Sequence, residues 1–318
     1  MSRLRYRGRF APSPTGPLHL GSLAAALASW LDARAHQGVW LVRIEDIDPP
    51  REEPGAAQSQ LYTLARLGMI ADEAPVYQST CVHHYEQALS RLQREGQVYP
   101  CACSRTVAEL AARSQGLAPQ VYPGTCRDGP VGNGPMSSRV RVPAQVVQFD
   151  DRACGSFSQH LQSEVGDFVV RRADGLWSYQ LAVVVDDARQ GVTDVVRGAD
   201  LLDNTPRQIH LQGLLGLATP RYLHVPVIKA SGGAKLSKQT GAAPLDVDAP
   251  LRELDAAWRH LGFAPTGLTR VAEFLQRAVS LWRERWSLPA APADTIVASA
   301  FNRAERETDP GAPTGPPA

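Results

Sequence analysis

Residues 9–33, RFAPSPTGPLHLGSLAAALASWLDA, decide how the fold begins. Prolines and glycines break regular structure, and they stand here directly before a helix predicted over 20–34. The N–H groups and positive dipole end of such a helix attract phosphate. Gly21 lets a flat base or ribose lie against the backbone, and His19 and Ser22 can donate hydrogen bonds to phosphate oxygens. The stretch predicts an anion site, although such a loop taken alone is more often an ordinary turn and cap.

Length and composition narrow the class of protein. The 318 residues predict two domains, and the net charge of +1 gives no overall attraction to nucleic acid or membrane. No apolar run is long enough to cross a membrane, and the N-terminal MSRLRYRGRF lacks the apolar core of a secretory signal. Five cysteines, an odd number, argue against a disulfide framework and for a reducing compartment. We therefore expect a cytoplasmic protein. As a separate expectation, the protein is a monomer.

The order of elements predicts an α/β protein with a Rossmann-type parallel sheet, because a strand at 7–11 and one at 39–48 flank the first helix. Further helices are predicted over 52–67, 80–95 and 203–217, a strand over 222–229, and helical structure over 250–287. The run 167–187 reads as strand-like, with Asp186 and Asp187 as a supporting pair at a strand end. The predicted units are two halves of the Rossmann domain (1–97 and 181–245), an inserted α+β subdomain (98–180), a helical segment (246–290) and a disordered tail (291–318).

A second segment is chemically related to the first. KLSKQ, residues 235–239, follows the glycine-containing SGGA. Two lysines three residues apart on a loop with glycine hinges suit mobile clamps on a polyphosphate. Taken alone, the pentapeptide could equally be a solvated basic loop.

Together these two segments resemble the paired nucleotide motifs of class I aminoacyl-tRNA synthetases. HLGS (19–22) looks like the HIGH element and KLSKQ like the KMSKS element, and the longer opening string is similar to that of glutamyl-tRNA synthetases. The resemblance covers about residues 7–245. It implies that ATP, with Mg²⁺, binds at His19, Gly21, Ser22 and Lys238. It also implies that His19, Ser22, Lys235 and Lys238 assist catalysis.

A glutamate pocket requires fixed cations for carboxylates and an anion for the ammonium group. Arg9 and Glu45 follow the first and second strands, so both fall at the sheet edge where open α/β folds bind ligands. An arginine fork matches a carboxylate, although a surface ion pair is the plain alternative. The resemblance implies that the glutamate-binding residues are Arg9, Phe10, Ala11, Pro12, Ser13, Glu45 (for the ammonium), Tyr179 and Arg197. Tyr179 could instead be a core residue, and Arg197 could pair with Asp194 or Asp200.

Three cysteines predict a metal site. Cys101 and Cys103 form C-x-C, and Cys126 follows in YPGTC. Three nearby thiolates favour one structural zinc ion with four tetrahedral ligands, whereas buried cysteines without metal are the alternative. Chemistry leaves the fourth ligand open among the more distant Cys81, Cys154, His83 and His84 and the closer Tyr122. The resemblance points to Tyr122.

Residues after 245 are too few to build the anticodon-binding domain of a glutamyl-tRNA synthetase. The chain therefore resembles the short paralogues that activate glutamate without tRNA and attach it to queuosine in the anticodon arm of tRNA(Asp). Two alternatives remain: a short synthetase that charges a tRNA 3′ end, and a zinc-containing RNA-binding module without catalysis. Arginines of the insertion could follow RNA phosphates, although scattered arginines are more often solvated; they are Arg127, Arg139, Arg141, Arg171 and Arg172.

Overall fold

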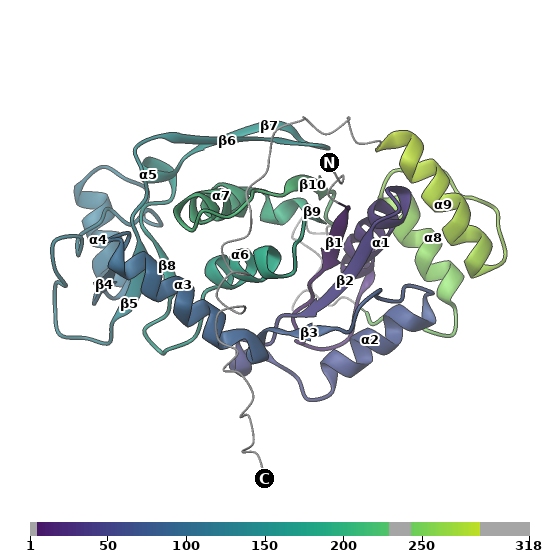
Figure 1. Cartoon of the computed structure of the whole chain (residues 1–318), viewed down its shortest axis with the longest axis horizontal. Helices are drawn as coiled ribbons and strands as arrows, with labels where there is room; N and C mark the ends of the chain where they lie inside the picture. Colours follow the sequence, from purple (N-terminus) through teal and green to yellow (C-terminus); the bar gives the residue numbers. More distant parts are fainter. Residues whose placement is uncertain (1–4, 229–242, 287–318) are drawn as a thin grey trace, which may run out of the picture.

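The computed structural model describes residues 5–228 and 243–286 (Figure 1). The strands are β1 (Arg7–Phe10), β2 (Val39–Ile44), β3 (Val76–Tyr77), β4 (Val98–Cys101), β5 (Ser137–Val140), β6 (Val146–Asp151), β7 (Gly155–His160), β8 (Phe168–Arg171), β9 (Asp194–Gly198) and β10 (Arg221–Val225). The helices are α1 (Leu20–Ala35), α2 (Ala56–Arg66), α3 (Val82–Arg94), α4 (Arg105–Ser114), α5 (Leu161–Glu164), α6 (Tyr179–Arg189), α7 (Thr205–Leu214), α8 (Pro250–His260) and α9 (Val271–Arg285).

A parallel sheet forms the centre of the molecule. β1 pairs with β2 and β2 with β3, while β9 pairs with β10, all in parallel. β1 also lies against the start of β9, where the Thr193 N–H donates to the Arg7 carbonyl at 2.9 Å. The strand order is therefore β3-β2-β1-β9-β10, and the direction of winding reverses between β1 and β9. This confirms the predicted α/β fold with a parallel sheet, and such a reversal point is where open α/β folds bind ligands.

Helix α1 joins the sheet to the C-terminal helices. Its alanine-rich surface is almost completely buried, and it contacts both α8 and α9, which lie at the right in Figure 1. Asp32, fully buried on α1, accepts hydrogen bonds from Tyr6 (2.6 Å), Arg152 (2.6 and 2.9 Å) and the Trp282 indole (2.8 Å). One buried carboxylate with four such bonds ties together segments that are far apart in the sequence.

The strand-like reading of residues 167–187 is correct for β8 but wrong for its second half. Residues Tyr179–Arg189 form α6, and its N-cap is Ser178, whose hydroxyl accepts from the Gln180 N–H. Leu181 to Asp187 is buried at every position. A helix buried on all sides shows no polar face, so its valine-rich sequence cannot be distinguished from a buried strand by periodicity. Asp186 and Asp187 are therefore helical residues rather than a pair at a strand end.

The region expected as an insertion contains an antiparallel sheet, β4-β5-β8, together with α4, at the left in Figure 1. Its apolar side chains share one buried cluster with α3, α6 and α7, including Tyr85 and Leu211. The β6–β7 hairpin extends instead toward the central sheet, where β6 pairs with β10. The buried cluster includes residues on both sides of positions 98 and 180. The predicted domain boundaries at these positions stay a prediction.

Within the two described ranges, no helix is long and apolar enough to span a membrane. The expected disordered tail (291–318) and the KLSKQ segment with Lys235 and Lys238 lie outside the described residues.

Candidate active site

His19 is the N-cap of α1. Its Nδ1 atom accepts from the backbone N–H groups of Gly21 (3.1 Å) and Ser22 (3.2 Å). The Ser22 hydroxyl accepts from the His19 N–H at 2.8 Å and donates to the His19 carbonyl at 2.7 Å, which completes a capping box. With Nδ1 as the acceptor, a neutral ring carries its hydrogen on Nε2. His19 can thus cap the helix through Nδ1 and donate through Nε2. Phosphate binding by Ser22 stays a prediction, and it would break the bond from the Ser22 hydroxyl to the His19 carbonyl.

The loop between β1 and α1 is held by neighbouring elements. Gln60 on α2 donates through Nε2 to the carbonyls of Ser13 (3.0 Å) and Gly16 (2.8 Å). The Glu45 N–H, at the end of β2, donates to the Pro12 carbonyl at 2.9 Å. This loop includes Ala11, Pro12 and Ser13, and it follows Phe10, the last residue of β1. Its backbone is therefore fixed beside Glu45 before any ligand binds.

Arg9 and Glu45 belong to one buried cluster of charges. Arg9 binds Asp187 through Nε to Oδ1 (2.9 Å) and Nη2 to Oδ2 (3.2 Å). Arg43, fully buried, donates to Asp187 at 2.7 Å and to Glu45 at 3.2 Å. The cluster thus contains two cations and two anions, supplied by β1, β2 and α6.

The two carboxylates of this cluster differ electrostatically. Burial raises the pKa of Glu45, and the attraction of Arg43 and Arg9 only partly opposes this effect. Burial also acts on Asp187, but Arg9 and Arg43 hold the pKa of that carboxylate below its ordinary value. Glu45 is therefore the carboxylate whose burial is less fully compensated by positive charge, although Arg43 donates to it at 3.2 Å. An added ammonium group would complete this compensation.

Tyr179 and Arg197 form a second pair. The Arg197 Nη1 group donates to the Tyr179 hydroxyl at 3.3 Å. Asp194 pairs with Arg221 at 2.7 Å, so one of the two expected alternative partners of Arg197 is engaged elsewhere. Arg197 lies on β9 and Arg9 on β1, and these two strands contact one another, so the two arginines belong to the same part of the sheet. The structure therefore gathers the predicted residues of β1, β2, α6 and β9 around one reversal point of the sheet.

The described chain resumes next to His19. Residue Pro244 forms an antiparallel bridge with His19, and the Leu245 N–H donates to the Leu18 carbonyl at 3.1 Å. Lys238 precedes Pro244 by six residues, and six residues span at most about 20 Å. The sequence distance between His19 and Lys238 therefore does not prevent them from meeting.

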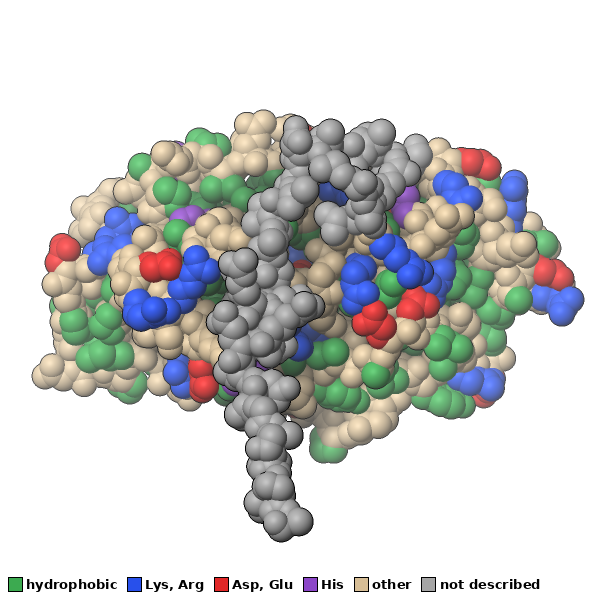
Figure 2. Space-filling view, in the orientation of Figure 1, with side chains coloured by type: hydrophobic (Ala, Val, Ile, Leu, Met, Phe, Trp, Pro, Cys, Tyr) green, Lys and Arg blue, Asp and Glu red, His purple; other side chains and the backbone are tan. Residues whose placement is uncertain are grey.

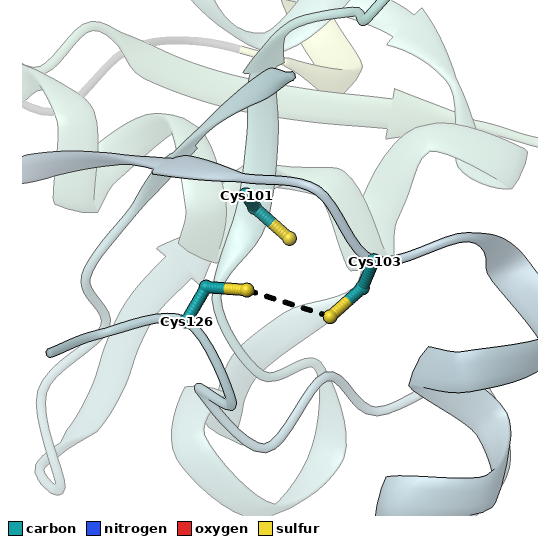
Figure 3. Close-up of side chains that lie close together, drawn as sticks. All are labelled: Cys101, Cys103 and Cys126. Carbon is teal, nitrogen blue, oxygen red and sulfur yellow. Dashed lines mark hydrogen bonds between the residues drawn. The ribbon is translucent and has the colours of Figure 1, made fainter. Parts of the chain in front are cut away.

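Cys101, Cys103 and Cys126 converge, as Figure 3 shows, with ligand atoms all within 4.8 Å of one another. The sulfurs of Cys103 and Cys126 are 3.5 Å apart, and the Tyr122 hydroxyl lies 3.2 Å from Cys101 and 3.5 Å from Cys103. Zinc–sulfur bonds of about 2.3 Å put two tetrahedral sulfur ligands about 3.8 Å apart. Three thiols and one phenol thus have the spacing of a four-ligand metal site.

Protonation in this group depends on its hydrogen bonds. Burial raises the pKa of Cys126, but hydrogen bonds from Tyr122 and the Val131 N–H outweigh burial and bring the pKa to about 6. Burial raises the pKa of Tyr122, so the residue is a neutral phenol unless a metal displaces the proton. Cys81 and Cys154, considered as the fourth ligand, contact Arg189 and the His224 carbonyl instead.

The insertion arginines all have partners within the chain. Arg127 pairs with Asp167 at 2.6 Å, Arg139 stacks on the Tyr122 ring, and Arg172 pairs with Asp174. Arg141 stacks on a tyrosine ring and Arg171 on a tryptophan ring. Figure 2 shows basic side chains on this face in separate groups, several of them beside acidic ones. Their contact with RNA stays a prediction.

Sequence reasoning missed several residues that hold the predicted site residues: Arg43, Gln60, Thr205 and His224, the last two of which bond to Arg197, and Asp151, which bonds to His224. Arg43 carries a usable signal, because a charged side chain inside the apolar strand VWLVRI demands a buried partner. The others stand in unremarkable local sequence, and their positions become informative only once the strands are ordered.

Residues 5–255 match the family described as tRNA synthetases class I (E and Q), catalytic domain. The chain therefore belongs to this family of class I tRNA synthetases. It is 60% identical to the glutamyl-Q tRNA(Asp) synthetase of Burkholderia mallei, covering 89% of this chain and 97% of that relative. It is 58% identical to the protein of the same name from Cupriavidus metallidurans, covering 88% of this chain and 92% of the relative.

A solved structure gives the same picture of the fold. The glutamate-tRNA synthetase of Elizabethkingia anophelis superposes with a TM-score of 0.65 at 27% identity, over 74% of this chain and 53% of that chain. The chain thus corresponds to about half the length of that synthetase.

Proposed function

We propose that this chain activates glutamate with ATP and then transfers the glutamyl group to queuosine in the anticodon of tRNA(Asp). The observation that carries the proposal is the 60% identity to a glutamyl-Q tRNA(Asp) synthetase, which covers 97% of the length of that relative. The charge arrangement around the reversal point of the sheet supports it, because that site offers both cationic and anionic groups to an acidic amino acid.

In this proposal Glu45 binds the glutamate ammonium group, because Arg43 and Arg9 only partly compensate the burial of its carboxylate. Arg197 and Tyr179 bind one carboxylate through a guanidinium N–H and a hydroxyl. Arg9 contributes positive charge. The fixed loop that follows it forms the wall of the pocket, with contacts from Phe10, Ala11, Pro12 and Ser13.

The ATP site lies at the N-terminus of α1. His19 donates from Nε2 to a phosphate oxygen, and Gly21 leaves space for the base or ribose. Ser22, Lys235 and Lys238 complete the phosphate contacts, with Lys238 stabilising the charge that develops on the leaving pyrophosphate. A Mg²⁺ ion that accompanies ATP supplies further neutralisation of the phosphates when bound.

The first reaction is an exchange at phosphorus. A glutamate α-carboxylate oxygen attacks the α-phosphorus of ATP, the bond to the bridging oxygen breaks, and pyrophosphate leaves with the electron pair. In the second reaction a queuosine hydroxyl attacks the activated carbonyl and AMP leaves. The adenylate phosphate accepts the hydroxyl proton. The protein mainly positions the reactants and neutralises charge.

The metal in this proposal is a single structural zinc ion held by Cys101, Cys103, Tyr122 and Cys126. The donor set suits zinc, because three thiols and one oxygen at these distances match a closed tetrahedral site. The zinc-bearing region 98–180 then acts as a subdomain that contacts the anticodon arm. The protein works as a monomer in the cytoplasm.

ATP–pyrophosphate exchange tests the first reaction. We expect glutamate-dependent exchange without RNA, and absence of exchange would favour the RNA-binding module. Transfer of labelled glutamate tests the second reaction on three substrates: tRNA(Asp) with queuosine, the same tRNA without queuosine, and queuosine-containing tRNA(Asp) lacking its 3′-terminal adenosine. The first and third should accept glutamate. Labelling of the queuosine-free tRNA would instead identify a synthetase acting at the 3′ end.

A further inference from the structure

Almost all of the N–H donors of the Arg197 guanidinium group have acceptors in the protein. Its Nε–H donates to Nε2 of His224 at 3.0 Å, and Nη2 donates to the Thr205 hydroxyl (2.8 Å) and the Leu201 carbonyl (3.4 Å). Nη1 donates once, to Tyr179. A guanidinium group has five N–H donors, so one Nη1 hydrogen has no acceptor within the described residues. The Tyr179 hydroxyl accepts from Arg197, which leaves its own hydrogen for donation beside that Nη1 group.

These contacts define the tautomer of His224. Since Arg197 Nε always carries a hydrogen, the facing Nε2 of His224 must be an acceptor. The other ring nitrogen, Nδ1, lies 2.6 Å from Oδ2 of Asp151 and therefore carries the ring hydrogen. Asp151 is itself held by the backbone N–H groups of Ala153 and Cys154. His224 is thus a neutral ring with its hydrogen on Nδ1.

Arg197, His224 and Asp151 form a row across three neighbouring strands of the sheet. His224 on β10 is the register partner of Arg197 on β9, and Asp151 on β6 is the register partner of Tyr222, two residues before His224. All three side chains are buried, with 5% exposure or less. Burial lowers the pKa of His224, and hydrogen bonds to His224 and to backbone N–H groups bring the pKa of Asp151 to about 2 despite burial. Both directions agree with a neutral imidazole beside an ionised carboxylate.

We propose that Asp151 and His224 are positioning residues that fix the Arg197 guanidinium so that its remaining Nη1 hydrogen and the Tyr179 hydroxyl point together at one carboxylate of glutamate. The inference rests on the proposed function, which gives Arg197 its ligand. Asp151 holds the His224 tautomer, and His224 holds Nε of Arg197. Neither residue touches the substrate.

Three variants test the roles of Asp151 and His224 in steady-state ATP–pyrophosphate exchange. His224→Leu removes the acceptor for Arg197, and we expect the KM for glutamate to rise about tenfold while the KM for ATP changes less than about twofold. His224→Gln places a carbonyl oxygen near the position of Nε2 and should recover most of this loss. Asp151→Asn permits the other tautomer and should raise the KM for glutamate as His224→Leu does.

Ser29→Ala is the matched control, because it removes the buried hydrogen bond that the Trp40 indole on β2 donates to the Ser29 hydroxyl on α1, and it should lower stability without raising the KM for glutamate. Exchange in the wild-type protein together with an unchanged KM in His224→Leu overturns this inference alone. Absence of exchange in the wild type overturns the proposed function, and the inference with it.

Nitrogen-15 NMR reads the tautomer in the wild-type protein itself, and the variants serve only to assign the His224 signal. Labelled histidine should show, for the signal that disappears in His224→Leu or His224→Gln, a protonated Nδ1 and an unprotonated Nε2 between pH 6 and pH 8. A hydrogen on Nε2 in that range would overturn the proposal.

Discussion

Asp187 binds Arg9 through two parallel hydrogen bonds, at 2.9 and 3.2 Å, although 178 residues separate them in the sequence. The same carboxylate accepts from Arg43 at 2.7 Å. One acidic side chain on α6 therefore orients a cation on each of the first two strands. Arg9 is thus linked to Glu45 by a chain of hydrogen bonds that runs through Asp187 and Arg43.

Asp187→Ala should lower the free energy of unfolding by about 3–5 kcal/mol, because it leaves two arginines buried without their partner. Urea unfolding at pH 7 measures this loss. The control is Asp174→Ala, whose pair with Arg172 is exposed to solvent and whose removal should change stability little. Equal effects of the two variants would contradict the buried role of Asp187.

His19 combines a cap with a proposed phosphate contact, and two variants separate these roles. His19→Ala removes both, so stability should fall by about 1 kcal/mol and exchange activity should fall with it. His19→Asn retains a good N-cap and should keep the stability of α1, yet it cannot reach a phosphate as the imidazole does. Thermal unfolding and ATP–pyrophosphate exchange measure the two effects. Full exchange activity in His19→Asn would exclude a catalytic role for the ring.

Lys238→Ala should reduce kcat for exchange by about 10²–10³, because the lysine is proposed to stabilise charge that develops only in the transition state. The KM for glutamate should change little. Lys229→Ala, which lies outside KLSKQ, is the control and should retain exchange. An unchanged kcat in Lys238→Ala would contradict the proposal that KLSKQ acts as the KMSKS element.

The metal site is tested by elemental analysis of purified protein. Wild-type protein should contain about one zinc ion per chain, and Cys126→Ser or Cys103→Ser should lose it. Tyr122→Phe keeps the ring but removes the oxygen, and should reduce zinc affinity. Cys154→Ser, an exposed cysteine outside the cluster, should retain the metal. Zinc retained in Tyr122→Phe at wild-type affinity would remove Tyr122 from the ligand set.

Asp151 makes stability depend on pH in a defined direction. Its pKa is lowered to about 2 in the folded chain, so its contribution is present above the ordinary aspartate pKa of about 3.9 and is lost as pH falls toward 2. Asp151→Asn should therefore be less stable than the wild type at pH 7 by about 2 kcal/mol. This difference should disappear near pH 2. Unfolding free energies measured across that range provide the test, and a constant difference would contradict it.

The local sequence was enough to predict the first strand, α1, the second strand and the parallel sheet. It was also enough to bring Cys101, Cys103 and Cys126 together as a candidate metal group. These predictions succeeded because apolar spacing, helix caps and ligand spacing are short-range properties. The same reasoning failed for α6, because a helix buried on every side carries no periodic signal.

The sequence by itself determined the class of fold, the start of α1 after the proline- and glycine-containing loop, and the chemical types that the proposed glutamate site would use. Only the tertiary structure decided which groups face one another: Asp187 between Arg9 and Arg43, and the row from Asp151 through His224 to Arg197. The physical reason is that a buried charge or imidazole is defined by its partners. Those partners come from strands and helices whose neighbours are set by the order of the sheet, not by their distance along the chain.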